Sequence, residues 1–310
     1  NANASNIMYA FQSGIERKEN NVDDRLVAHV HVHDRYYDTA VKNKYYSRSY
    51  TLKGERKINI SDELSIGFGS DYNYNKGEFN IHGNWGSYAR GHSDNLGIFT
   101  NLGYKFNENT IFSSHLRGDK HKYSQENVTY RLNLTKLINN YAFSLSESTG
   151  LRHPDLYVLH GKNPSGTFKS MATTKPETSL TRELSLKYFF SNDVSFKTTA
   201  YKGTISDVLN RGTATSGYNE IIDIKQEGIE NSLVFKNDYQ KLTLSNTFSK
   251  SREDDGSPQL RRPEQQFGVK YSREFFTNIF GPFDLNYDYR HVGQVEDWKN
   301  GTIRAKVDSS

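Results

Sequence analysis

Residues 64–74 alternate between apolar and polar side chains over their whole length. Leu64, Ile66, Phe68, Tyr72 and Tyr74 have the same parity, and the residues between them are mostly small or polar. Successive side chains of a strand point to opposite faces, so this segment is predicted to be a strand with one apolar and one hydrated face. The two tyrosines at one end of the apolar face suit a boundary between an apolar phase and water.

The same two-residue period recurs along most of the chain. It is found in residues 7–15, 26–33, 46–58, 96–106, 112–116, 128–134, 141–145, 180–190, 194–200, 229–235, 242–248, 267–271 and 283–289. No segment shows a sustained helical period. The sequence therefore predicts an all-β protein with about 14 strands.

The connections between these strands alternate between short and long. Short polar turns are expected near residues 59–63, 107–109, 136–140, 191–193 and 237–241. Long loops are expected near residues 36–45, 75–94, 119–126, 149–177, 205–217, 252–264 and 294–302. This alternation is typical of an outer-membrane barrel, whereas a β-sandwich has no reason to keep it and repeats its strands every 8–12 residues or so.

The composition excludes several other classes. Only 34% of the residues are hydrophobic while 13% are aromatic, which disfavours both a thick soluble core and a disordered chain. The chain has no cysteine, so disulfides and thiolate metal sites are excluded. A net charge of +4 does not support nucleic-acid binding. No apolar run approaches the ~20 residues of a spanning helix, but a barrel strand needs only ~9–11 alternating residues.

Together these features predict an antiparallel transmembrane β-barrel. Lipid offers no hydrogen-bond partners, so the strands must close into a ring with the apolar parity toward lipid and the polar parity toward a lumen. About 14 strands exceed the small barrels that are filled by their own side chains, so the lumen is expected to hold water or a plug.

Candidate ligand-binding residues are expected on the outer loops and in the upper lumen. Aromatic and cationic side chains on exposed loops are suited to hold a bulky ligand. The candidates are Tyr37, Tyr45, Asp71, Asn73, Phe79, His82, Trp85, Tyr88 and Arg90. Interfacial tyrosines and packing between loops are the alternative interpretation of the aromatic members.

Three histidines, His29, His31 and His33, share one predicted strand face. They could approach one zinc or copper ion, but a run of polar lumen-facing residues is the preferred interpretation, so no metal site is predicted. No Ser–His–Asp spacing, pair of carboxylates or glycine-rich phosphate loop singles itself out. Neither a catalytic residue nor a cofactor is therefore predicted.

Residues 142–190 contain a recognisable succession of motifs. A strand, a proline before an aromatic residue, a Lys-Pro-Glu and a strand with a glutamate follow each other, and they include Pro154, Lys175, Pro176, Glu177 and Glu183. This succession resembles the barrel signature of TonB-dependent outer-membrane receptors. Residues 201–209, 226–230 and 260–271, with Arg261 and Arg262, are similar to the cobalamin (vitamin B12) branch. The resemblance extends over about residues 95–307.

The resemblance implies that residues 1–310 form one partial barrel domain, incomplete at both ends, of a roughly 22-stranded barrel in the bacterial outer membrane. It implies active import of a scarce nutrient by a monomer without enzymatic activity, with cobalamin as the first candidate ligand and a ferric siderophore as the second. The implied partners are outer-membrane lipid and the TonB energy-coupling complex, acting through a plug domain outside this chain. The alternatives are a passive porin and a secreted β-rich carbohydrate-binding protein or hydrolase, which predicts an apolar core between two sheets.

Overall fold

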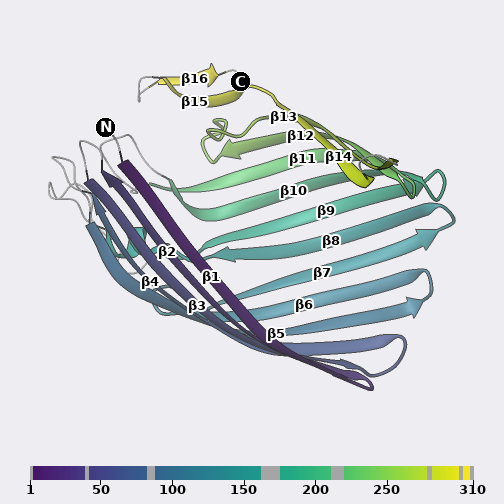
Figure 1. Cartoon of the computed structure of the whole chain (residues 1–310), viewed down its shortest axis with the longest axis horizontal. Coiled ribbons are helices and arrows are strands. Elements are labelled where there is room, and N and C mark those ends of the chain that lie inside the picture. Colours follow the sequence, from purple (N-terminus) through teal and green to yellow (C-terminus); the bar gives the residue numbers. More distant parts are fainter. Residues whose placement is uncertain are drawn as a thin grey trace.

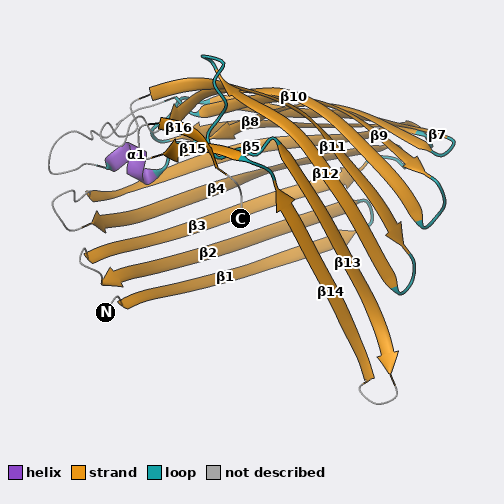
Figure 2. Ribbon diagram, turned by 90° about the horizontal axis from the view of Figure 1, so that it is seen from above, coloured by secondary structure: helices purple, strands orange, loops and turns teal. Residues whose placement is uncertain are grey.

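Fourteen strands form a single antiparallel sheet in which the spatial order follows the chain order. The structure is a computed structural model that describes residues 3–38, 42–81, 88–161, 175–210, 220–277, 281–299 and 303–307. Figure 1 shows the strands side by side from β1 to β14, and Figure 2 shows the sheet curved like part of a barrel wall. The predicted all-β class, the antiparallel arrangement and the number of strands are confirmed.

The strands of this sheet are long, and each has at least twelve residues. Their bounds are β1 Asn3–Glu19, β2 Val22–Asp38, β3 Lys42–Asn59, β4 Leu64–Ile81, β5 Tyr88–Asn107, β6 Thr110–His121, β7 Asn127–Ile138, β8 Tyr141–Arg152, β9 Glu177–Phe189, β10 Val194–Asn210, β11 Glu220–Lys236, β12 Gln240–Glu253, β13 Gln265–Thr277 and β14 Gly281–Val292. The other described elements are the helix α1 (Leu156–His160) and the two-stranded sheet of β15 (Val295–Lys299) and β16 (Ile303–Val307). Within the described residues, no helix is long and apolar enough to cross a membrane.

Several strands extend through segments that the sequence predicts to be long loops, and this part of the prediction is wrong. Most of 36–45 and 75–94 belongs to β2, β3, β4 and β5, and parts of 119–126, 205–217, 252–264 and 294–302 are also strand. Both faces of the longer extensions carry many polar or aromatic side chains, so they lack the apolar parity that marks the other strands. The backbone is nevertheless paired with the neighbouring strand, which satisfies its hydrogen-bonding groups.

The five predicted short turns are confirmed, since the strands on either side of each are separated by two to four residues. The turn between β7 and β8, which is one of these five, and the turn between β1 and β2 have two residues each. Each contains an asparagine with positive φ: Asn139 and Asn20, both at 49°. Asparagine tolerates this left-handed conformation better than most residues, and such turns match the twist of a hairpin.

The two parities form two different faces across the whole sheet. Large apolar side chains on one face are exposed, as Phe11, Ile98 and Leu184 show with exposed fractions of 65%, 63% and 58%. We call this the outer face. On the opposite, inner face, Asp71 and Asp119 are buried, with exposed fractions of 8% and 6%. Exposed apolar groups and buried charges are the reverse of a soluble protein and match the barrel prediction.

A secreted sandwich would bury an apolar core between two sheets. Within the described residues, the only other sheet is the small β15–β16 pair, and the buried apolar side chains are limited to Ala89, Phe99, Val158, Leu159, Ile222 and Ile224. The described residues therefore do not contain the core that the sandwich alternative requires.

The backbone pairing of the sheet stops at β1 and β14. Within the described strands, β1 pairs only with β2, and β14 pairs only with β13. Both edges therefore keep backbone groups that are available for further pairing.

The turn at Asn139 provides a test of how β7 and β8 are connected. We expect Asn139→Val to lower the unfolding free energy in detergent by about 1–3 kcal/mol, because a β-branched residue is strained at positive φ. Asn139→Gly is the control and should be nearly neutral, since glycine adopts this conformation freely. Urea unfolding followed by circular dichroism measures both variants, and equal midpoints for the two would contradict the turn geometry.

Candidate functional site

A row of aromatic rings crosses the inner face at the end far from the short turns. Tyr37 of β2, Tyr45 of β3 and Phe79 of β4 follow each other, with ring centroids 6.2 Å and 4.6 Å apart. Tyr157 of α1 continues the row, 5.0 Å from Phe79. The guanidinium of Arg35 lies 4.5 Å from the ring centroid of Tyr37. We call Tyr37, Tyr45, Phe79 and Tyr157 the aromatic row.

A hollow of about 270 Å³ lies beside the aromatic row. Tyr45, Phe79 and Tyr157 contribute to its lining together with Arg35 and His33. The rings meet edge to face, with interplanar angles of 84°, 70° and 72°. Together with the cation and the imidazole they offer apolar and hydrogen-bonding contacts to a ligand.

A charged network lies next along the inner face, on β4, β5 and β6. The guanidinium of Arg117 donates two hydrogen bonds to Asp71, from Nη1 at 2.5 Å and from Nη2 at 3.0 Å. It also donates two to Asp119, from Nε and Nη2, both at 2.7 Å. Bidentate pairing of this kind is the strongest that arginine makes with carboxylates.

Neutral side chains add further hydrogen bonds to the two carboxylates. Asn73 donates to Asp71 at 2.8 Å and accepts from Thr51 at 2.7 Å, while Asn95 donates to Asp119 at 2.7 Å. We call Asp71, Asn73, Asn95, Arg117 and Asp119 the inner network. Since its charges are paired with one another, its chemistry is that of a rigid, oriented wall.

Glycines make room for these contacts on β5. A Cβ atom at Gly97 would lie 2.0 Å from Nη2 of Arg117, so the guanidinium in its observed position occupies the space that this glycine leaves. A Cβ atom at Gly91 would lie 2.1 Å from the ring of His160. The missing side chains therefore position both Arg117 and α1.

Helix α1 is held against the inner face of β4 and β5 by a small apolar contact. Val158 and Leu159 are buried, with exposed fractions of 4% and 2%. Asp155 caps the helix, because its Oδ1 accepts from the backbone N–H of Val158 at 2.8 Å. The helix therefore forms part of the inner wall beside the aromatic row.

Two stacked histidines connect α1 to the inner network. The rings of His121 and His153 lie 4.3 Å apart and nearly parallel, and Ser124 Oγ lies 2.9 Å from His153 Nδ1. Burial lowers the pKa of His153 to about 4, with a further contribution from His121. His153 is consequently neutral at physiological pH.

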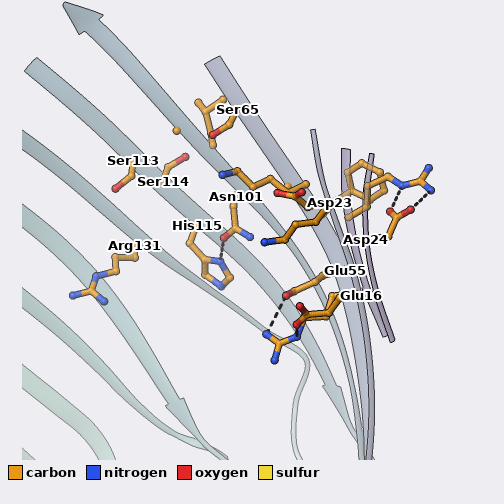
Figure 3. Close-up of a pocket in the computed structure, with 18 residues that line it drawn as sticks. Glu16, Asp23, Asp24, Glu55, Ser65, Asn101, Ser113, Ser114, His115 and Arg131 are labelled. Carbon is orange, nitrogen blue, oxygen red and sulfur yellow. Dashed lines mark hydrogen bonds and ion pairs between the residues drawn. The ribbon is translucent and has the colours of Figure 1, made fainter. Parts of the chain in front are cut away.

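A second hollow, of about 560 Å³, lies on the inner face near the short turns. Arg25 bridges Glu16 and Glu55 there, at 3.1 Å and 3.8 Å, and Figure 3 shows these two carboxylates facing the same space. His115 Nδ1 lies 2.6 Å from Oδ1 of Asn101 in the same view. Residues of β1 to β7 line this one hollow, so the inner face is concave.

The structure brings five of the predicted ligand-binding residues to the inner face: Tyr37, Tyr45, Asp71, Asn73 and Phe79. The expectation that Tyr37, Tyr45 and Phe79 lie on loops is wrong, since all three are strand residues.

Tyr88 and Arg90 do not join this group. They are strand residues of β5 with the outer-face parity, and Arg90 lies 4.0 Å from Glu78. Their positions next to the inward Ala89 show how one residue of register separates the two faces. His82 and Trp85 lie outside the described residues.

The motif residues lie at the end of the sheet far from the short turns or on the inner face. Glu177 pairs with Arg152 at 3.1 Å, Lys175 lies 3.7 Å from Asp207, and Pro176 is buried. Arg261, with φ of 59°, pairs with Asp297 at 3.0 Å. The others are found between β8 and α1 (Pro154), on the inner face of β9 (Glu183) and in a hollow beside β15 (Arg262).

The three histidines of β2 share the inner face, as predicted. The rings of His31 and His33 lie 6.3 Å apart, and His33 Nε2 lies 2.6 Å from Asn6 Oδ1. In the part of the chain that the structure describes, no group of three or more metal-ligating side chains is assembled.

The sequence prediction did not include Arg117, Asp119, His121 or α1. The sequence does contain a signal for Arg117, Asp119 and His121. In a strand over residues 115–121 these three side chains and His115 would share one face. The helix has only five residues, which is too short for a helical period to be visible.

A curved antiparallel sheet with an apolar outer face and a charged inner face is the wall of an outer-membrane type of β-barrel. The chain matches the family model "TonB dependent receptor-like, beta-barrel" over residues 3–309, and it belongs to this family.

Solved structures of similar fold are receptors and a transporter. The ferric yersiniabactin uptake receptor FyuA from Yersinia pestis has a TM-score of 0.73 at 10% identity, over 97% of this chain and 52% of that chain. The copper transporter OprC has a TM-score of 0.75 at 13% identity, over 97% and 54%. The siderophore receptor PirA from Acinetobacter baumannii has a TM-score of 0.71 at 16% identity, over 98% and 52%.

The chain thus spans about half the length of these three structures. A comparison with curated protein sequences found no match.

The inner network predicts an asymmetric response to mutation. Arg117→Met should lower the unfolding free energy by about 3 kcal/mol, because it leaves two buried carboxylates without their partner. The triple variant Arg117→Met/Asp71→Asn/Asp119→Asn should recover much of this loss. Chemical unfolding in detergent measures both, and a triple variant less stable than the single one would contradict the network.

The contact of α1 is expected to weaken in acid. His153 has a lowered pKa in the folded protein, so its neutral form stabilises the contact above the unfolded value of 6.5, and this contribution is lost as pH falls toward about 4. Hydrogen exchange at the Val158 and Leu159 amides, corrected for intrinsic rates, should show protection falling across this range. His153→Gln should remove the dependence; an unchanged pH profile in that variant would show that another group is responsible.

Proposed function

We propose that the whole protein is an outer-membrane receptor that actively imports a scarce metal-containing nutrient, and that residues 1–310 form part of its barrel wall. The observation that carries this proposal is that apolar side chains are exposed and charged side chains are buried, the reverse of a soluble protein. Ile98 and Leu184 are exposed on the outer face, whereas Asp71 and Asp119 are buried on the inner face. Lipid outside and a polar lumen inside account for both.

The aromatic row is the proposed ligand-contacting surface. Tyr37, Tyr45, Phe79 and Tyr157 present a run of rings beside a hollow of about 270 Å³. The inner network below it holds the wall rigid, so ligand binding costs little ordering of the strands.

Two metal complexes are the candidate ligands of this surface. Cobalamin is supported by the resemblance of residues 226–230 and 260–271. A ferric siderophore is supported by the similarity in fold to receptors described by that class of ligand.

Inward release requires energy, because a scarce nutrient must be moved against its gradient. We propose that the TonB complex supplies this energy through a plug domain encoded outside residues 1–310. The long inner face, concave and lined with polar groups, has the shape to enclose such a domain. The proposed protein acts as a monomer.

Uptake by the complete protein tests the proposal. When the complete protein is expressed in cells that lack the endogenous gene, radiolabelled cobalamin or a labelled ferric siderophore should accumulate. An uncoupler of the proton gradient should abolish this accumulation. Uptake that persists with the uncoupler would indicate a passive porin. Binding of neither complex would overturn the proposed ligand class.

Binding to the purified protein should depend on the aromatic row. Tyr45→Ala should weaken binding by about three- to tenfold, as expected for the loss of one ring contact. Tyr50→Ala is the matched control, because Tyr50 lies on the same strand, has the opposite parity and is exposed on the outer face. Equal effects of the two substitutions would contradict a ligand surface on the inner face.

A further inference from the structure

The outer face of β9 to β12 changes from apolar to charged along the strands. Leu184, Ala200, Ile229 and Phe248 lie directly opposite one another on successive strands and form an apolar line. The next outward position, two residues farther from the short turns, is occupied by Arg182, Lys202, Glu227 and Lys250. Lys225 and Arg252 occupy the position beyond on β11 and β12. The charged positions therefore begin where the apolar line ends.

Cations predominate in this region. We call Arg182, Lys202, Lys225, Lys250 and Arg252 the basic patch. Arg182 lies directly opposite Lys202, and Lys225 lies directly opposite Arg252. Like charges at opposed positions of an antiparallel pair are destabilising, so the sheet carries two unfavourable pairs. Glu227 lies directly opposite both Lys202 and Lys250 and offsets part of their charge, so the patch keeps more cations than carboxylates.

Carboxylates neutralise only part of the patch. Arg182 pairs with Glu147 at 2.6 Å, and Arg252 pairs with Glu264 at 2.7 Å. Among the described residues, no carboxylate oxygen lies within 4.0 Å of the ammonium groups of Lys202, Lys225 or Lys250. All three lysines are exposed. An anion from outside the chain would relieve the repulsion that the protein itself leaves.

Near the short turns of β1 to β3, outward cations are paired with a carboxylate of the protein. Near the short turns, Arg17 and Arg56 share the carboxylate of Asp24, at 2.8 Å and 2.6 Å. These outward arginines are therefore paired within the protein, unlike the three lysines of the basic patch.

The position of the patch identifies the kind of anion. One step of two residues, about 7 Å along a strand, separates Lys202 and Lys250 from the apolar line, and Lys225 lies one step farther. A soluble anion would contact only the cations and would leave the apolar line exposed. An amphiphile with an anionic head and acyl chains contacts both, and the long stems of lysine let the ammonium groups reach a headgroup above the apolar surface.

We propose that the basic patch binds the phosphate-bearing headgroup of a membrane lipid whose acyl chains lie along the apolar line of β9 to β12. This inference rests on the proposed membrane function. It adds a defined lipid site to one sector of the outer face. If the end with the short turns faces the periplasm, the lipid belongs to the outer leaflet.

Lipid retention by the complete detergent-solubilised protein tests the site. The probes are lipid A carrying two phosphates, the same lipid after removal of its phosphates, and inorganic phosphate, and bound lipid is counted by native mass spectrometry. The protein should retain the phosphorylated lipid in preference to the dephosphorylated one by on the order of a hundredfold, from about fivefold for each of three lysines.

Two matched triple variants separate the site from net charge. Lys202→Gln/Lys225→Gln/Lys250→Gln should remove the preference. Lys187→Gln/Lys197→Gln/Lys241→Gln, which changes the same number of lysines on the inner face of β9, β10 and β12, should retain it. Equal loss in both variants would overturn the site.

The remaining outcomes also decide the question. Equal retention of both lipids by the unmodified protein would overturn the site while leaving the barrel in the membrane. Displacement of the lipid by inorganic phosphate at equal concentration would identify free phosphate as the ligand and overturn the lipid. A protein that is monodisperse without detergent and does not enter bilayers would overturn the proposed function and this inference together.

Discussion

The structure depends on an almost unbroken backbone register across fourteen strands. Side chains alternate with a period of two, so a slip of one residue in any strand would exchange its lipid-facing and lumen-facing sets. Register shifts within the described pairs occur only between Lys105 and Asn107 and between Ile205 and Val208. Both lie near strand ends, and the central part of each strand keeps its parity. The apolar outer face, the inner network and the basic patch all follow from this one constraint.

The inner network shows how register also positions chemistry. Gly97 of β5 lies directly opposite Asp71 of β4 on one side and Asp119 of β6 on the other. Two carboxylates therefore flank a position without a side chain, and Arg117 extends across it. Three consecutive strands thus contribute to one hydrogen-bonded network of charged groups. Because Arg117 pairs with both carboxylates, the network fixes the geometry of the wall beside the aromatic row.

The sequence was sufficient to predict the class of fold, the faces and the short turns, because these depend on parity and on local turn chemistry. It was insufficient for strand length: Tyr37, Tyr45 and Phe79 lie in strand extensions whose two faces are both polar or aromatic, so parity carries no signal there. The same limit explains why Tyr88 and Arg90 were grouped with Phe79 although register places them on the outer face. The alternation of residues 115–121 places Arg117 and Asp119 on one face of a strand. Their partner Asp71 is 46 residues away from Arg117 in sequence, and only the pairing of the strands brings the three side chains together.

Helix α1 changes what the inner face offers to a ligand. The aromatic row does not end at the sheet, because Phe79 is followed by Tyr157 at 5.0 Å, which the connection after β8 supplies. The glycine at position 91 gives the helix room, and the neutral His153 allows its approach to the charged network. A surface built jointly by sheet and connection can vary its ligand through the connection while the register of the strands stays constant.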